Sequence, residues 1–252
     1  MRILVSNDDG INAEGLTVLE DIARTLSDDV WVVAPEHEQS GASHSLSLSD
    51  PIRLRKIDDR RFAIKGTPTD CVLMAINEIM PEKPDLVLSG VNRGHNIADD
   101  VTYSGTVAAA MEGAVCGITS IAVSQAYGFH SHDELSYETT IKHGPKVIKQ
   151  LASLELGPDC LLNVNFPDCD PDEVAGVEVT RQGKRDSNNF EIEKREDGWQ
   201  KSYYWFGFRR ENSNAIEGTD LWAMKNKFIS VTPLHLNLTH VGAIDTVAAA
   251  LK

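Results

Sequence analysis

The sequence predicts an α/β fold in which a mostly parallel sheet carries helices on both faces. Short apolar segments alternate along the chain with longer segments whose apolar residues recur at helical spacing. The apolar segments are nearly continuous, which is typical of strands that are buried on both sides. The 252 residues, of which 41% are hydrophobic, are enough to form one substantial core.

The first strand is expected at residues 2–6, where RILVS is a short run with β-branched residues. Residues 16–26 follow with apolar side chains at helical spacing and predict the first helix. A second apolar run, VWVVAP, ends at Pro35. Residues 52–57 and 61–66 flank a turn-like DDR and predict a hairpin between two of the repeated units.

The tripeptide TPT at 67–69 opens the next expected helix, which continues through DCVLMAINEIM. DLVLSG then indicates a buried strand, and the small residues of 104–117 indicate a helix that Gly117 closes. SIAVS and CLLNVNFP are two further expected strands. A helix within residues 135–154 is expected to connect them.

The chain changes in character after about residue 175. Residues 184–201 are charge-dense and are expected to form a solvated arm or hairpin. YYWFGF and FISVTPL indicate strands, and VGAIDTVAAAL indicates a closing helix. We therefore expect a single domain over residues 1–252, with a core over about 1–180 and a C-terminal extension over about 181–252.

The composition excludes several classes of protein. The net charge is −14, from 38 acidic and 24 basic residues, and such a field disfavours binding to duplex nucleic acid. The sequence has no apolar run of the roughly 18–20 residues that a membrane span requires, and its start lacks a signal peptide pattern, so we expect a cytoplasmic protein. The four cysteines are far apart and contain no C-x-x-C pair, which argues against disulfides and a zinc site.

Two adjacent aspartates, Asp8 and Asp9, follow the first strand in the stretch SNDDG. Ligands of open parallel sheets bind beyond the carboxyl ends of the strands, which is where this pair is expected. Adjacent carboxylates can share one target only where the chain turns, and Gly10 permits a turn. On its own, the motif could equally be a helix N-cap or an Asx turn.

Common phosphate-binding and phosphoryl-transfer motifs do not match this loop. GINAEG lacks the middle glycine of the dinucleotide fingerprint, and Leu16 stands where a P-loop requires its phosphate-binding lysine. DDG is not the D-x-D of haloacid-dehalogenase-like phosphatases, and PDLVLSG lacks the acceptor aspartate of response-regulator receivers. A dinucleotide-dependent oxidoreductase is therefore disfavoured.

Two further strand ends supply oxygen ligands. The loop after the second strand offers Ser40, and the loop after DLVLSG offers Asn92 and Asn96. Carboxylate, hydroxyl and amide oxygens suit Mg²⁺ or Mn²⁺ and are poor ligands for zinc or copper. The sequence therefore predicts a divalent-cation site that also involves Asp8 and Asp9, although each loop alone could be an ordinary turn.

An anion site is expected at the start of the alanine-rich helix. Ser104 and Thr106 flank Gly105 where this helix begins. A helix N-terminus offers unpaired N–H groups and about half a positive charge, and glycine lets an anion approach closely. Ser104 could also serve only as an ordinary N-cap. A cation next to this N-terminus would reverse the repulsion that an acidic chain exerts on a phosphate ester.

Long motifs distributed over nearly the whole chain resemble the SurE family of stationary-phase survival nucleotidases. They are SNDDGINAEGL, PEHEQSGAS, GTPTDCV, SGVNRGHNIADDVTYSGTVAAAMEGA and SVTPLHLNLT. The resemblance is weakest between about residues 125 and 215, so no preference for a base is carried over. Two departures are Glu14, where relatives often have proline, and Asn237, where they often have aspartate.

The resemblance implies a divalent-metal-dependent phosphatase that acts on nucleoside 5′- and 3′-monophosphates, with one Mg²⁺ or Mn²⁺ per subunit. It places the metal ligands at Asp8, Asp9, Ser40 and Asn92, and the phosphate contacts at Asn96, Ser104, Gly105 and Thr106. It also implies a Rossmann-like core and homodimers or homotetramers that exchange C-terminal segments.

The expected reaction is hydrolysis of a phosphate monoester, with Asp8 and Asp9 as the catalytic residues. Metal-activated water is the preferred nucleophile, and direct attack by Asp8 is the alternative. His44 and His95 are expected near the site, but nothing in the sequence identifies the general acid. The alternative function is a non-catalytic Mg²⁺-dependent nucleotide sensor that uses the same loops.

Overall fold

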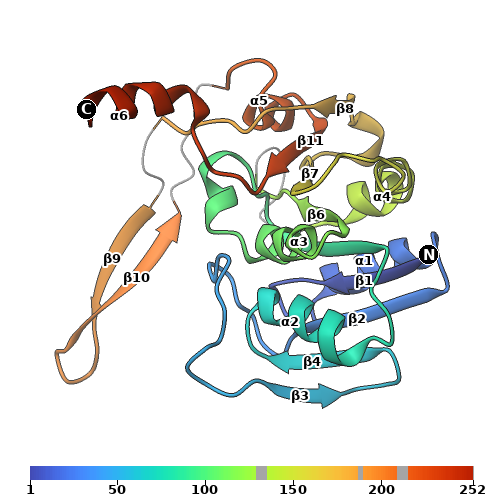
Figure 1. Cartoon of the computed structure of the whole chain (residues 1–252). Coiled ribbons are helices and arrows are strands. Elements are labelled where there is room, and N and C mark those ends of the chain that lie inside the picture. The colour runs from blue at the N-terminus through green and yellow to red at the C-terminus, as the bar shows by residue number, and fades with distance from the viewer. Residues whose placement is uncertain (129–134, 187–189, 209–214, 252) are drawn as a thin grey trace.

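The computed structural model describes residues 1–128, 135–186, 190–208 and 215–251 of the chain. Within these residues the core is a nine-stranded sheet (Figure 1). Its strands, in spatial order, are β3 (Arg53–Lys56), β4 (Arg61–Lys65), β2 (Asp29–Pro35), β1 (Arg2–Ser6), β5 (Leu86–Arg93), β6 (Thr119–Gln125), β7 (Cys160–Phe166), β11 (Phe228–His235) and β8 (Gly176–Val179).

The sheet is mostly parallel, which confirms the predicted fold class. Neighbouring strands from β4 to β7 all run in the same direction. Antiparallel pairs occur at β3–β4, the predicted hairpin, and at β7–β11. The chain leaves β1 toward β2 on one side and later returns to β5 on the other, so strand order reverses at β1. Ligands of such sheets bind at this switch point, beyond the carboxyl ends of the strands.

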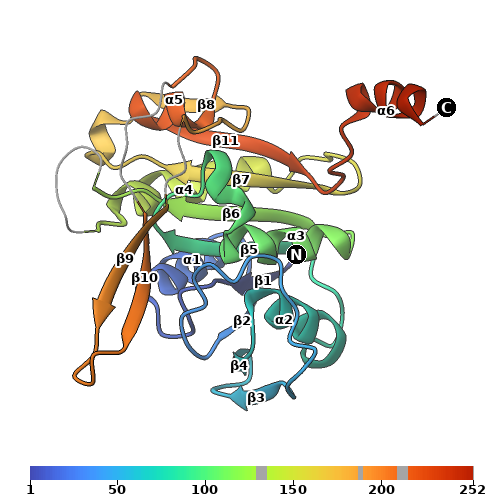
Figure 2. The ribbon, with the colours of Figure 1, turned by 90° about the vertical axis from the view of Figure 1, so that its left-hand side faces the viewer.

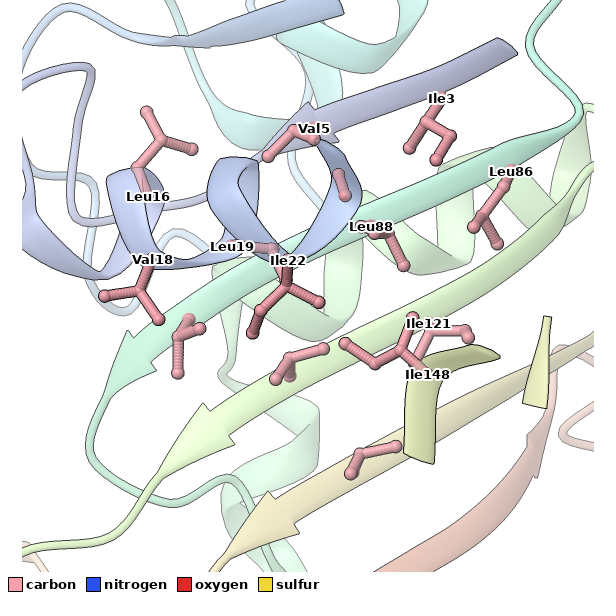
Figure 3. Close-up of a cluster of buried hydrophobic side chains, with 14 of the residues drawn as sticks. Ile3, Val5, Leu16, Val18, Leu19, Ile22, Leu86, Leu88, Ile121 and Ile148 are labelled. Carbon is pink, nitrogen blue, oxygen red and sulfur yellow. The ribbon is translucent and has the colours of Figure 1, made fainter. Parts of the chain in front are cut away.

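Helices α1 (Glu14–Arg24) and α4 (Glu138–Leu151) cover one face of the sheet. Ile3 and Val5 of β1 and Leu88 of β5 point to this face, where they pack against Leu19 and Ile22 of α1 (Figure 3). Side chains two residues apart on a strand share a face, so this alternation gives the sheet two apolar sides.

The opposite face is covered by α2 (Pro68–Met74) and α3 (Gly105–Val115). Here Leu4 and Val87 meet Cys71 and Ala109. At Gly113 an added Cβ would lie 2.3 Å from the Ser120 hydroxyl oxygen, so glycine allows α3 to lie directly on the sheet.

Two helices begin or end differently from the expectation. The helix expected to extend to residue 80 is α-helical only over Pro68–Met74 and continues as a π-helix over Ala75–Ile79. Its start has the expected cap, because the Thr67 hydroxyl accepts from the Asp70 N–H and the Asp70 carboxylate accepts from the Thr67 N–H. The first helix begins two residues earlier than its apolar spacing suggests. Helix α4 lies within the range expected for it.

The C-terminal part divides into segments inside and outside the sheet. Strands β8 and β11, with helix α5 (Asp220–Lys225) beside them, extend the sheet. Strands β9 (Phe190–Glu196) and β10 (Ser202–Phe208) form the expected hairpin, and α6 (Ile244–Ala250) is the expected closing helix. Figures 1 and 2 show the hairpin and α6 away from the sheet. The core boundary at about residue 180 stays a prediction.

Among the residues that the structure describes, no helix is both long enough and apolar enough to cross a membrane. The cytoplasmic location stays a prediction.

Candidate active site

Asp8 lies directly beyond β1 and is 4% exposed. Its Oδ1 accepts a hydrogen bond from the Thr106 hydroxyl at the start of α3. A Cβ added at Gly105 would lie 2.8 Å from the Asp8 Cβ and 2.9 Å from Oδ2. Glycine at this position therefore lets the helix N-terminus touch the carboxylate.

The turn that carries the two aspartates is held by Asn7. Its Nδ2 donates to the Gly10 carbonyl at 3.0 Å, and its Oδ1 accepts from the Gly10 N–H at 3.2 Å. Gly10 has a φ of +102°, which few other residues adopt. The turn that the sequence predicted after Asp9 is thus present, with Asn7 rather than the aspartates closing it.

Asp9 faces the end of β5. Its Oδ2 accepts from the Arg93 backbone N–H at 3.0 Å, next to Asn92. The Asn92 amide donates through Nδ2 to the Gly94 carbonyl at 2.8 Å. This bond fixes the amide and leaves Oδ1 as the atom with which Asn92 could ligate a cation.

The loop that carries Ser40 is tied to both sides of this cluster. The Gln39 N–H donates to the Asp8 carbonyl at 2.7 Å. The Ser43 N–H donates to the Tyr103 carbonyl at 3.2 Å, just before α3. The Ser40 side chain is exposed and donates to Glu38 Oε1 at 2.8 Å. The structure therefore brings the Ser40 loop next to Asp8, while the Ser40 hydroxyl points to a neighbouring acid.

The expected phosphate contacts divide into two groups. Gly105 and Thr106 touch Asp8, and Ser104 caps α3 because its Oγ accepts from the Val107 N–H at 3.0 Å. Asn96 is 7% exposed and is anchored elsewhere, since its Nδ2 donates to the Ser124 hydroxyl at 2.9 Å.

Ser124 links the two asparagines that follow β5. It pairs in register with Asn92 across the β5–β6 edge, and it accepts the hydrogen bond from Asn96. Four of the expected site loops, those around residues 8, 40, 92 and 104, are thus joined by direct hydrogen bonds, and the Asn96 loop is connected to them through β6.

The acid pair carries two neighbouring negative charges, and the Arg93 backbone N–H and the Arg93 charge offset only part of the charge of Asp9. Burial raises the pKa of Asp8 to about 6, and the nearby Asp9 charge adds to the rise, although the Thr106 hydroxyl opposes it. Burial also raises the pKa of Asp9, and Glu38 contributes. Within the described part of the chain neither carboxylate forms a salt bridge.

This donor set fits a hard divalent cation. Buried carboxylates without a counter-charge are costly, and a cation between them would remove that cost. No group of three His, Cys, Asp or Glu side chains suited to a metal occurs among the residues described, so a cation here would complete its shell with hydroxyl, amide or water oxygens. Mg²⁺ and Mn²⁺ accept such ligands and Zn²⁺ does so poorly.

The two histidines considered in the sequence make other contacts. His44 Nε2 lies 2.8 Å from Glu112 Oε2 of α3. His95 Nε2 lies 3.2 Å from an Arg185 nitrogen and 3.9 Å from Asp100 Oδ2. These contacts give both rings a structural role in the loops around the site.

Sequence reasoning missed several residues that support the site. Asn163 and Asn165 of β7 and Asp220 of α5 all bind the backbone of the loop that carries Asn96. The N-V-N pattern of 163–165 was a possible signal, because it places two amides on one face of an otherwise buried strand. Asp220 gave no such signal, since an acid in the first turn of a helix is common.

Comparisons with known protein sequences agree over the whole length of the chain. The sequence model of a family described as "Survival protein SurE" matches residues 3–189. A Mesorhizobium japonicum protein named 5'-nucleotidase SurE is 56% identical over 252 residues, and a protein of the same name from Methylorubrum extorquens (strain PA1) is 54% identical over 253 residues. Both matches cover 100% of this chain and of the relative.

The fold also matches that of a SurE protein of known structure. The crystal structure of the SurE protein from Aquifex aeolicus superposes with a TM-score of 0.85 at 38% identity, and the match covers 100% of both chains. Sequence and fold thus agree with the resemblance seen in the motifs, and the chain belongs to the SurE family.

Proposed function

We propose that this protein is a divalent-metal-dependent phosphatase that hydrolyses nucleoside 5′- and 3′-monophosphates to nucleoside and inorganic phosphate. The observation that carries the proposal is the buried Asp8 carboxylate, which lies against the N-terminus of α3 without a cationic partner in the described structure. The names of the relatives support the substrate class, since each is called a 5'-nucleotidase.

One Mg²⁺ or Mn²⁺ per subunit would be held by Asp8, Asp9, Ser40 and Asn92. When bound, such an ion supplies a Lewis acid that polarises a phosphoryl oxygen and lowers the pKa of water. The chain itself supplies rigid ligands: Thr106 orients Asp8, the Arg93 N–H orients Asp9, and the Gly94 carbonyl orients the Asn92 amide. A preorganised set of ligands avoids the entropic cost of ordering them when the ion binds.

The N-terminus of α3 would bind the phosphate. Its partial positive charge and its first-turn N–H groups favour an anion, and Gly105 permits a close approach. The same N–H groups would stabilise the charge that accumulates on the phosphoryl oxygens during the reaction. Asn96 would donate its amide to the phosphate from the opposite loop, which places the ester between two fixed elements.

The nucleophile is proposed to be water. In that reaction one water–phosphorus bond forms as the ester P–O bond breaks, the water loses a proton and the leaving oxygen gains one. The alternative, attack by Asp8, forms an aspartyl-phosphate that water cleaves in a second step. A nucleotide with a chiral phosphorothioate separates the two routes, because one displacement inverts the configuration at phosphorus and two retain it. Retention would reject direct attack by water.

Phosphate release is the direct test of the function. The purified protein is assayed with AMP, GMP, their 3′ isomers and p-nitrophenyl phosphate, in Mn²⁺ or Mg²⁺ and again after EDTA. We expect release from the nucleotides that requires the metal and returns when it is restored. Metal-dependent nucleotide binding without any release would instead indicate the non-catalytic sensor. Release that EDTA leaves unchanged would reject the metal.

We also propose that the protein forms homodimers or homotetramers that exchange C-terminal segments. In the hairpin, Trp199 is 83% exposed and Phe206 is 73% exposed, and Leu238 before α6 is 91% exposed. Large apolar side chains rarely stay in water when they are grouped, and such patches typically mark interfaces. Light scattering after gel filtration tests this proposal, and a monomer at micromolar concentration would reject it.

A further inference from the structure

The connection between β5 and α3 contains a 3-10 helix over Ala98–Thr102, and the 95–100 loop, which is the first part of this connection and runs into that helix, carries Asn96. On one side it is held by β7. Asn165 Oδ1 accepts from the Asn96 N–H at 2.8 Å, and the Asn163 and Asn165 amides donate to the Asn96 carbonyl at 2.7 and 3.2 Å. Asn96, one of the expected phosphate contacts, therefore lies in the part of the loop that is fixed to the sheet, and Ser104, another expected contact, follows the loop.

The other side of the loop is held by residues more than 80 positions later in the chain. Asp220, at the start of α5, is fully buried, and its Oδ2 accepts from the Ala98 N–H at 2.8 Å. Its Oδ1 accepts from the Gly183 and Leu221 N–H groups at 2.8 and 2.7 Å. Gln182 completes the contact, because its Nε2 donates to the Ala98 carbonyl at 2.7 Å.

The contacts from Asp220 and Gln182 hold Ala98 in an unfavourable backbone conformation. Its φ is +52°, in the left-handed region that residues with a Cβ rarely adopt. Both of its backbone polar groups are bound by distant side chains, the N–H by Asp220 and the carbonyl by Gln182. A strained residue persists only where its surroundings fix it, and such residues often occur at functional sites.

A second set of contacts secures the end of the loop. Lys184 forms an ion pair with Asp99, and the Arg185 N–H donates to Asp99 Oδ2 at 3.0 Å. The Arg185 guanidinium binds Asp100. The segment 182–185, which precedes the β9–β10 hairpin, thus runs along the loop and is itself anchored by Asp220 through Gly183.

We propose that Asp220 is a positioning residue for phosphate binding: by holding Ala98, Gly183 and its own helix start together, it keeps the 95–100 loop in the shape that presents Asn96 and leads into Ser104. This inference rests on the proposed function in taking phosphate as the ligand and Asn96 and Ser104 as its contacts. Asp220 would not touch the substrate. It would act by raising the fraction of molecules whose 95–100 loop has the conformation that binds phosphate.

The substitution Asp220→Asn is suited to the test because it keeps the size of the side chain. The amide has one acceptor and one donor group. If its oxygen keeps the Gly183 and Leu221 N–H groups, its NH₂ meets the Ala98 N–H, and two donors cannot bond. The variant therefore loses the bond to the loop and can keep the bonds within the C-terminal part.

A matched control is Thr219→Ala at the preceding position. The Thr219 hydroxyl accepts from the Trp222 N–H at 3.3 Å and donates to the Ile216 carbonyl at 2.6 Å, so its loss weakens the cap of the same helix. Its side chain has no bond to the 95–100 loop in the described structure. Both variants are expected to lower the melting temperature, and only Asp220→Asn should affect the loop.

The experiment compares the full-length wild-type protein and both variants by three measurements. They are amide hydrogen exchange of peptides covering 95–100, calorimetric binding of inorganic phosphate in Mn²⁺, and KM and kcat for AMP. A charged hydrogen bond of typical strength predicts about tenfold faster exchange, about tenfold weaker phosphate binding and about tenfold higher KM for Asp220→Asn. Because ground and transition states need the same loop, kcat should stay within about threefold.

Other outcomes decide against the inference. Phosphate binding and KM in Asp220→Asn that match Thr219→Ala would overturn it, and so would faster exchange without weaker phosphate binding. A fall in kcat with KM unchanged would show that Asp220 does not act through phosphate binding. A wild-type protein that binds phosphate but hydrolyses no nucleotide would reject the proposed function alone, because the exchange and calorimetric comparisons would still decide the role of Asp220.

Discussion

The acid pair and the C-terminal hairpin differ in how far one subunit buries their apolar side chains and supplies hydrogen bonds to their polar groups. In the strands that lead to the acid pair, Val5 and Leu88 are fully buried, and the polar groups of the pair have hydrogen bonds from three other loops. In the hairpin, Trp205 is 58% exposed and Phe206 is 73% exposed.

This difference indicates that the candidate site can form within one subunit, whereas the hairpin would be stabilised only by contact with a partner. A site whose ligands are oriented by their own chain can be preorganised before any partner arrives. A surface rich in exposed aromatic side chains gains little until something covers it. Substitutions near Asp8 should therefore affect chemistry and folding directly, whereas substitutions in the hairpin should affect association.

The largest expected effect is on turnover and comes from Asp8→Asn. The amide keeps the shape of the carboxylate but removes the charge that would hold the proposed cation. We expect metal-dependent phosphate release to fall by at least about 10³-fold, or about 4 kcal/mol in the barrier. Circular dichroism should stay unchanged. Asp59→Asn, at an exposed acid that pairs with Lys56, is the control and should keep full activity. Activity of Asp8→Asn near the wild-type level would remove Asp8 from the site.

The second effect is on the stability of the metal-free protein as pH changes. The pKa of Asp8 is about 6 in the fold, above its ordinary value of 3.8, so the native state binds more protons than the unfolded state between these values. Stability attributable to Asp8 should therefore increase as pH falls from 7 to 4 and decrease as pH rises. A shift of about two units corresponds to roughly 3 kcal/mol.

This pH effect is measured as a difference, because other groups titrate in the same range. Urea unfolding of the wild-type protein and of Asp8→Asn is compared at several pH values in EDTA. The difference in unfolding free energy between the two proteins should change by roughly 3 kcal/mol over this pH range. This change with pH should become smaller when Mn²⁺ is added, because a cation favours the charged form of Asp8. A difference that is constant with pH would show that Asp8 titrates normally.

A smaller effect is expected from Gly105→Ala at the contact between α3 and Asp8. The new Cβ would lie 2.8 Å from the Asp8 Cβ and 3.2 Å from the Pro68 Cγ, so the helix or the loop must move. Such crowding costs about 1–3 kcal/mol in unfolding free energy and should also weaken phosphate binding. Gly198→Ala is a matched control, because an added Cβ there meets nothing within 4 Å. Equal stability of the two variants would contradict the close approach.

The sequence predicted the fold well where a periodic pattern was sufficient. The strand at 2–6 and the two runs ending near Pro35 and Gly90 were recognised because buried parallel strands have nearly continuous apolar residues. The position of β11 between β7 and β8 could not be predicted, because the pairing partner of a strand is set by tertiary packing and not by its own residues.

For the site, the sequence indicated which loops would meet but not how they are held. Asp8 and Asp9 were predicted because the two acids follow a strand at the edge of the sheet where ligands bind. The role of Asp220 depends on a hydrogen bond over 122 positions, which leaves no local pattern. The N-V-N stretch could have signalled buried amides, but not the partner of Asn165, which lies 69 positions away. The Ser40 hydroxyl, which donates to Glu38, shows that even a recognised residue can take a contact that spacing does not reveal.

The smallest effect on the folding of the subunit is expected from Trp205→Ser combined with Phe206→Ser in the hairpin. Both side chains are mostly exposed, so the free energy of unfolding of a dilute, isolated subunit should change by less than about 0.5 kcal/mol. By contrast, Leu88→Ala in the buried sheet should cost about 2–5 kcal/mol in unfolding free energy.

The same double variant tests whether the hairpin is covered in an oligomer. If it is, the variant should have a lower mass by light scattering. Its melting temperature should also no longer increase with protein concentration, as that of an associating protein does. An unchanged mass and an unchanged concentration dependence would mean that the exposed aromatic side chains are not part of the interface, and the contrast between the two regions would then require another explanation.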